Sequence, residues 1–174
     1  AIMTSLNFDT QTIVLVLATL LTGLTAGLCF TWNNAVTPGV GQLVDMGYLR
    51  SFQEMNRAII NPIFLIVFFG PFFLHIVNIF LFKSSSGTLL WMVVASAALY
   101  IIGLVAVTIF GNVPLNEILD KTDLMQASAE ELKLLRDKFE VKWNRFHLIR
   151  TVSTVLSFLL LLIICLSRTN TINT

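Results

Sequence analysis

The sequence predicts an all-α integral membrane protein, a four-transmembrane-helix bundle whose long final helix projects from the membrane. Of its 174 residues, 56% are hydrophobic and 12% are charged, whereas soluble domains are about one quarter charged. Four stretches contain no Asp, Glu, Lys or Arg, namely 10–44, 58–82, 84–116 and 151–167. Each approaches or exceeds the roughly 20 apolar residues that a span needs. The stretches are continuous rather than alternating, which indicates helices and excludes a β-barrel.

We expect a single membrane domain over 1–174, with spans at about 11–33, 59–82, 88–110 and 146–167. In the first span, Gly23 and Gly27 form a small-residue face that favours close helix packing. Pro38-Gly39 is expected to end that helix. Apolar residues at helical spacing predict a short amphipathic helix that runs into the second span, which contains Pro62 and Pro71.

The third span is expected to break at Gly111-Asn112-Val113-Pro114, because proline disrupts a helix interior. Ser128 and Glu131 form a capping box at a helix start. No Gly or Pro follows, so one helix should run from Ala129 to Leu166. It is longer than the roughly 30 Å hydrocarbon core, so the charged extension 129–145 should project into water, with the side chains of Glu130, Glu131, Lys133, Arg136, Asp137 and Lys138 solvated.

The distribution of charge predicts an orientation. Nine Lys and Arg residues lie in or near the two larger connections, which share one side of the membrane. Only two, Lys83 and Arg168, lie on the side that holds the termini and the short turn. The larger connections are therefore predicted to be cytoplasmic and both termini outside. A net charge of +1 indicates no nucleic-acid partner. Cys29 and Cys165 are expected at opposite membrane faces, too far apart for a disulfide.

Polar residues from several segments are predicted to meet at one membrane face. The final helix carries Trp143, His147, Arg150 and Thr151 on one side, because their spacing is i, i+4, i+7 and i+8. Polar groups within a membrane normally face the bundle interior. The other segments contribute Trp32 from the first span, Asn56, Arg57 and Asn61 near the second, and Asn112 and Asn116 after the third. The convergence of these residues predicts a binding or catalytic site.

Each residue also has a purely structural interpretation, and these alternatives stay open. Arg57 and Arg150 can extend toward the membrane interface, and Trp32 and Trp143 can belong to an interfacial aromatic belt. Asn112 and Asn116 can cap helix ends, and His147 and His75 can be satisfied by packing within the bundle. The histidines lie at different depths, and the sequence contains no HxxxH, CxxC or Gly-rich phosphate motif. We therefore predict no metal and no other cofactor.

The chain resembles the small four-span membrane proteins that include the anthrone oxygenases, many of which have no assigned function. The resemblance is carried by Gly23–Gly39 with Phe30 and Trp32, Asn56-Arg57-Ala58-Ile59 with Asn61-Pro62, Gly111-Asn112-Val113-Pro114-Leu115-Asn116, and Trp143 with His147 and Arg150-Thr151. The glycine–asparagine–proline stretch is the most specific of these. The resemblance implies oxygenation of an apolar aromatic anthrone to an anthraquinone with O₂, without metal or flavin.

For such a reaction, His147 is the predicted base, and Arg57 and Arg150 are predicted to stabilise an oxyanion. Substrate binding is assigned to Trp32, Asn56, Asn61, Asn112, Asn116, Trp143 and Thr151. The alternative is a non-catalytic lipid- or quinone-binding membrane protein, or an accessory subunit of a membrane complex. A transporter is disfavoured because the chain shows no clear inverted repeat. The expected partners are membrane lipid, an apolar small molecule, and further copies of the chain or other membrane subunits.

Overall fold

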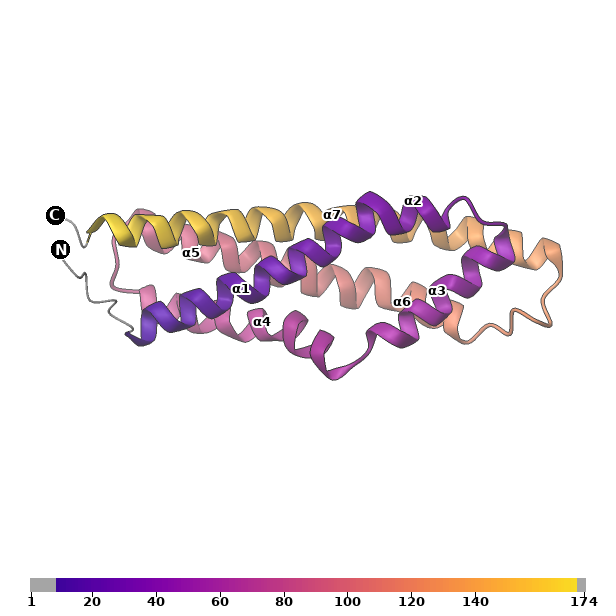
Figure 1. Cartoon of the computed structure of the whole chain (residues 1–174), viewed down its shortest axis with the longest axis horizontal. Helices are drawn as coiled ribbons and strands as arrows, with labels where there is room; N and C mark the ends of the chain where they lie inside the picture. The colour runs from indigo at the N-terminus through magenta and orange to yellow at the C-terminus, as the bar shows by residue number, and fades with distance from the viewer. Residues whose placement is uncertain (1–8, 172–174) are drawn as a thin grey trace, which may run out of the picture.

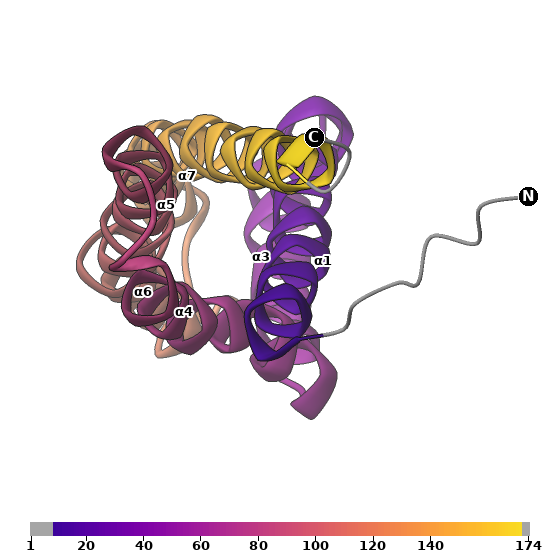
Figure 2. The same ribbon diagram turned by 90° about the vertical axis from the view of Figure 1, so that its left-hand side faces the viewer.

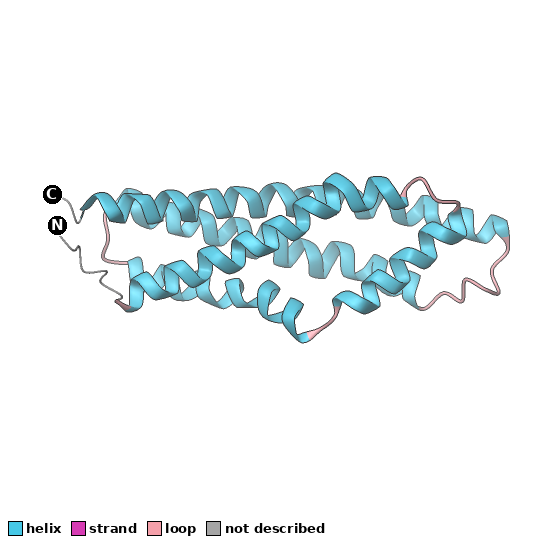
Figure 3. Cartoon of the chain, in the orientation of Figure 1, coloured by secondary structure: helices cyan, strands magenta, loops and turns pink. Residues whose placement is uncertain are grey.

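The computed structural model describes residues 9–171, and in this range the chain is helical and contains no strand (Figures 1 and 3). Four helical rods are long and apolar enough to cross a membrane: Thr10–Val40, Pro62–Phe82, Gly87–Asp120 and Ala129–Arg168. Figure 2 looks along the bundle and shows a ring in which α1 (Thr10–Thr31) packs between α4 (Pro62–Phe82) and α7 (Ala129–Thr171), opposite α5 (Gly87–Tyr100). The predicted four-span, all-α membrane fold is confirmed.

The first rod begins at Asp9, whose side chain accepts a hydrogen bond from the Thr12 amide at 2.7 Å, a common N-cap arrangement. After α1 come the π-helical segment η1 (Trp32–Val36) and α2 (Thr37–Val40). The rod therefore continues through Pro38-Gly39, where the sequence predicted its end. Pro38 lies in the first turn of α2, a position at which proline is tolerated.

The second rod is preceded by α3 (Asp45–Ile59), the predicted amphipathic helix. Its buried face consists of Tyr48, Leu49, Phe52 and Gln53. The chain then turns at Ile60, and α4 begins with Asn61 as its N-cap, whose side chain accepts from the Phe64 amide at 3.0 Å. Pro62 thus lies in the first turn of α4 rather than inside a continuous span, which corrects the prediction, whereas Pro71 does lie within the helix. Figure 1 shows the bend at this joint.

The third rod runs without a break through α5, η2 (Ile101–Ala106), η3 (Thr108–Asn112) and α6 (Val113–Asp120). The predicted break at Gly111–Pro114 is therefore wrong. Pro114 occupies the first turn of α6, directly after the π-helical η3, as Pro38 does after η1. A π turn is wider than an α turn, so it leaves room for a proline ring that would otherwise clash with the preceding turn.

The last rod, α7, has 43 residues, about 64 Å at 1.5 Å per residue, and extends beyond the predicted end at Leu166. Its capping box is confirmed: Glu131 Oε2 accepts from the Ser128 amide at 2.7 Å, and Ser128 Oγ accepts from the Glu131 amide at 3.2 Å. The charged first turns of α7 lie beside α3 and α6 (Figure 1). They form the end of the bundle that is farthest from the C-terminal end of α7. We call this the charged end.

Small residues let the rods approach closely. A Cβ added to Gly23 would lie 2.7 Å from the Phe158 ring on α7, so this glycine serves packing within the chain. Ser96 on α5 and Ser157 on α7 each donate a hydrogen bond to the other's carbonyl, at 2.9 and 2.8 Å. Reciprocal side-chain bonds of this kind stabilise helix pairs in lipid.

At the charged end, Arg136 is not solvated as expected, because its side chain is only 15% exposed. Its guanidinium donates to Glu140 at 2.7 Å, to Asp45 at 3.1 Å, and to the carbonyls of Leu43 and Gly41 at 2.7 and 2.8 Å. Its carbon Cζ lies 4.4 Å from the centroid of the Tyr48 ring. These contacts fasten the 41–44 connection and the start of α3 to α7.

Candidate functional site

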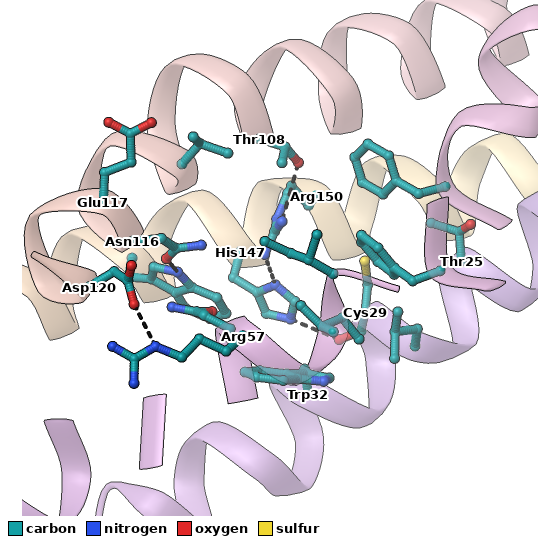
Figure 4. Close-up of a pocket in the computed structure, with 18 of the residues that line it drawn as sticks. Thr25, Cys29, Trp32, Arg57, Thr108, Asn116, Glu117, Asp120, His147 and Arg150 are labelled. Carbon is teal, nitrogen blue, oxygen red and sulfur yellow. Dashed lines mark hydrogen bonds and ion pairs between the residues drawn. The ribbon is translucent and has the colours of Figure 1, made fainter. Parts of the chain in front are cut away.

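A cavity of about 360 Å³ lies where α3 and α6 meet the membrane-spanning helices α1, α4 and α7 (Figure 4). Its volume falls within the range of roughly 300–1,000 Å³ that small-molecule sites occupy. Buried lining residues include Thr25, Cys29, Phe68, Trp143 and His147. The rim carries charged side chains, namely Arg57, Glu117, Asp120 and Lys121. The cavity is therefore mostly apolar inside, with His147 and Arg150 as polar groups of its wall, and charged at its opening.

His147 is held from both ring nitrogens. Arg150 donates from Nη2 to Nδ1 at 2.7 Å, and Nε2 lies 2.9 Å from the Cys29 carbonyl oxygen. An arginine side chain can only donate, so Nδ1 accepts and the neutral imidazole carries its proton on Nε2, which donates to that carbonyl. Thr151 donates to the Cys29 carbonyl at 3.3 Å and to the His147 carbonyl at 2.9 Å. His147 is thus fixed in one tautomer and one orientation.

Arg150 places a positive charge inside the cavity wall. Besides His147, it donates from Nη1 to Thr108 Oγ1 at 3.2 Å. Its Nε is buried and has no hydrogen-bond partner among residues 9–171. No carboxylate of the described chain pairs with it in an ion pair. A buried guanidinium without a counter-charge is costly, and it therefore favours an anionic or strongly polarised ligand atom.

Trp143 forms the flat wall of the cavity. Its ring stacks on the His147 ring, with centroids 5.0 Å apart and planes at 18°, and the Arg150 Cζ lies 5.3 Å from its centroid. Its indole Nε1 donates to Asn116 Oδ1 at 2.8 Å, which leaves the Asn116 amide NH₂ available to a ligand. Trp32, the first residue of η1, approaches from the end of the first rod, and its ring centroid lies 5.7 Å from that of Trp143. Both tryptophans are in position to contact an aromatic ligand.

An ion pair joins two elements across the rim. Arg57 on α3 donates from Nε to Asp120 Oδ1 on α6 at 2.8 Å, and both side chains are about half exposed. Glu117 pairs instead with Lys121 at 3.5 Å. Figure 4 shows the Asp120 carboxylate directed toward Arg57, whereas Glu117 points away from the other labelled residues. Asp120 therefore faces the cavity opening together with Arg57.

Seven of the residues predicted from the sequence line this cavity: Trp32, Asn56, Arg57, Asn116, Trp143, His147 and Arg150. The other three support neighbouring backbone. Asn61 caps α4, Asn112 donates to the Trp143 carbonyl at 3.2 Å, and Thr151 bonds the carbonyls described above. A direct role for these three in binding stays a prediction. Their hydrogen bonds already use the side-chain groups that would contact a ligand, except that Asn112 Oδ1 has no partner among residues 9–171.

Several lining residues were not predicted. Cys29 contributes a backbone carbonyl, which no side-chain pattern marks, and Thr108 lies in the wide η3 turn, which sequence periodicity does not predict. Asp120 follows Asn116 by four positions, the spacing that places side chains on one helical face, and it was detectable by that spacing. His75 does not line the cavity: it is fully buried in α4, with Nε2 3.2 Å from Thr22 Oγ1.

No three His, Cys, Asp or Glu side chains of residues 9–171 gather in a way that suits a metal ion. These features define a multi-pass integral membrane protein with a ligand-sized cavity near one end of its helices. A family model described as anthrone oxygenase matches residues 58–160, more than half of the chain, so the chain belongs to the anthrone oxygenase family. Comparisons with curated proteins and with solved structures returned no match.

Proposed function

We propose that this protein oxidises a flat, apolar aromatic ketone of the anthrone type to the corresponding quinone, with O₂ as the oxidant and without a metal or organic cofactor. The observation that supports this most is the Trp143–His147–Arg150 group in the cavity wall, within the part of the chain that matches the family. It combines an aromatic surface for the substrate with a buried positive charge for an oxyanion. Both apolar substrate and O₂ dissolve in the surrounding bilayer.

The chemistry begins at the methylene group opposite the anthrone carbonyl. Loss of one methylene proton leaves an aromatic enolate, whose charge rests largely on the oxygen. The enolate gives an electron to O₂, and the resulting pair combines at the same carbon to form a hydroperoxide. Loss of water from the hydroperoxide leaves the quinone, so one O₂ is consumed and one water is released per quinone.

Arg150 is the residue best placed to stabilise the enolate oxygen, because its buried Nε has no hydrogen-bond partner among the described residues. Donors preorganised around a developing oxyanion contribute the largest part of catalysis in many enzymes. Asn116 offers a second donor, since Trp143 orients its amide. Arg57, which the sequence analysis also assigned to the oxyanion, already uses Nε for Asp120 and Nη1 for Glu54 at the rim, so only its remaining donors are available for that role.

His147 has a different role in this proposal from the base predicted from the sequence. Its basic lone pair on Nδ1 already accepts from Arg150, which cannot give up its own proton. Protonation of His147 would bring an imidazolium against a guanidinium. His147 therefore serves to hold Arg150 in place, with the Cys29 carbonyl fixing its tautomer.

The test is O₂ uptake and quinone formation by the purified protein in nanodiscs supplied with anthrone. Arg150→Ala should lower kcat by about 100-fold or more, the effect of removing an oxyanion donor, and His147→Ala should also lower it strongly. Arg145→Ala changes an exposed arginine on the same helix and should leave the rate unchanged. Thermal unfolding checks that each variant folds. Full activity in both cavity variants would refute the proposal.

A non-catalytic alternative has one observation in its favour. The cavity rim joins exposed apolar residues, such as Ile60 at 70% exposure, to the charged Arg57 and Lys121, and this combination suits an amphiphile. A lipid or quinone that copurifies in stoichiometric amount, together with no turnover of anthrone, would favour this alternative.

A further inference from the structure

The proposed oxidation requires a base that removes a carbon-bound proton and gives that proton up again in every cycle. Within the cavity lining, the basic candidates are His147, Glu117 and Asp120. His147 is unsuitable because both ring nitrogens are engaged, one of them by a permanent cation. The base must therefore be sought at the rim.

Of the two rim carboxylates, Asp120 has the more suitable position. Figure 4 shows it directed toward Arg57 on the side of the cavity where Asn116 lies, whereas Glu117 points away. Arg57 binds Oδ1 at 2.8 Å, and no hydrogen bond joins Oδ2 to any residue in the described part of the chain. One carboxylate oxygen is thus fixed and the other is free to accept a proton.

Asp120 also meets the second requirement, contact with water. Its side chain is 52% exposed, so a proton taken from the substrate can exchange with solvent before it is passed on. Arg57 lies between the carboxylate and Glu54, and it pairs with both, at 2.8 and 3.4 Å. The arrangement holds Asp120 at the opening while Arg150 and Asn116 lie deeper in the cavity.

We infer that Asp120 is the general base of the proposed oxidation, with Arg57 as the positioning residue that orients its carboxylate. This inference rests on the proposed function. Aspartate acts as general base in an established enzyme that removes a proton adjacent to a ketone. The recognised ligand is an aromatic ketone seated with its oxygen toward Arg150 and its methylene toward the rim.

The step balances in atoms and charge. The Asp120 carboxylate takes one methylene proton, the C–H electron pair remains on the substrate as the enolate, and Asp120 becomes neutral. After the enolate has combined with O₂, the neutral acid returns its proton to the peroxide anion and is again a carboxylate. Removal of the remaining proton at that carbon breaks the O–O bond and forms the quinone carbonyl. The released hydroxide takes up that proton to give water.

The deprotonation can be measured without O₂. Wild-type protein in nanodiscs is incubated anaerobically with anthrone in D₂O, and deuterium incorporation at the methylene is followed by NMR above the buffer rate. Asp120→Asn should lower the catalysed exchange by about 100-fold or more, as expected for loss of a general base. Asp137→Asn, a matched change at an exposed aspartate on α7 that does not line the cavity, should leave it unchanged. Glu117→Gln, at the neighbouring rim carboxylate, should lower it far less than Asp120→Asn does. Asp120→Glu should recover part of the exchange.

Quenching of tryptophan fluorescence by anthraquinone reports binding separately, because Trp32 and Trp143 line the cavity. Asp120→Asn should bind the quinone like wild type while it fails to exchange. Wild-type exchange rates in Asp120→Asn would overturn the inference, even if the wild type produces quinone. If Asp120→Asn loses quinone binding and Asp120→Glu restores binding but not exchange, the inference is likewise wrong. A wild type that exchanges the methylene but forms no quinone under O₂ would refute the proposed function and leave Asp120 as a base.

Discussion

Replacement of Gly103 by alanine tests whether the third rod packs on α7 as closely as described. Gly103 lies in the π-helical η2 and faces Ser153 on α7. A Cβ at this position would overlap Ser153 Oγ and Ser153 Cβ. A Cβ cannot rotate away, so the two helices must move apart. Ser153 is one turn from Arg150, and the separation would disturb the cavity wall.

The expected cost is about 1–3 kcal/mol, the range for overpacking a well-filled core. Gly27→Ala is the matched control, because a Cβ at Gly27 would meet nothing within 4 Å. That change should stabilise the protein by up to about 1 kcal/mol through helix propensity alone. The two glycine-to-alanine changes are thus expected to act in opposite directions.

Unfolding in detergent, followed by helical circular dichroism, gives the free energies. The double variant Gly103→Ala with Ser153→Gly moves the contacting side chain to the other helix and should recover about 1–3 kcal/mol relative to the sum of the single changes. Equal stability of Gly103→Ala and Gly27→Ala would refute the close approach of η2 and α7. Additive effects in the double variant would show that Ser153 is not the clashing group.

Three further outcomes concern the rest of the bundle. Burial raises the pKa of Tyr48, so its ionisation favours the unfolded chain: stability should be unaffected by this group at neutral pH and fall above about pH 10. Tyr48→Phe should remove the part of this fall in stability that comes from ionisation of Tyr48, which unfolding curves of both proteins at alkaline pH would show. Identical pH dependence in the two proteins would contradict the prediction. Ser96→Ala and Ser157→Ala should each cost about 1 kcal/mol, and the double variant less than the sum, whereas full additivity would argue against reciprocal bonding. Arg136→Ala should cost roughly 1.5–3 kcal/mol and speed proteolysis next to Asp45, and unchanged cleavage would refute the fastening role.

The sequence predicted the spans well, because lipid requires long helical apolar runs and these are visible in composition. It predicted the breaks poorly. Pro38 and Pro114 were expected to end helices, since proline normally does so, but each follows a π-helical segment that makes room for it. No residue pattern in the sequence marks such segments, because they depend on the packing of neighbouring helices.

The cavity residues were likewise predicted only in part. His147 and Arg150 share a face of one helix, and helical spacing alone brings them together. The contact of Arg57 with Asp120 joins segments 63 residues apart, and spacing cannot show such pairs. The Cys29 carbonyl is a backbone group, so its role in fixing His147 was not visible in the sequence.

The wide turns of η3 also determine which way α6 faces. An α-helix rotates by about 100° per residue, and the extra residue of a π turn shifts everything after it by that angle. A return of η3 to ordinary α geometry with the same number of residues would keep the rod helical but rotate α6 by about that angle relative to the rest of the bundle. Asn116 and Asp120 would then point in a new direction, away from Trp143 and Arg57. The cavity lining thus depends on the π geometry of η3 as well as on the identity of the residues that follow it.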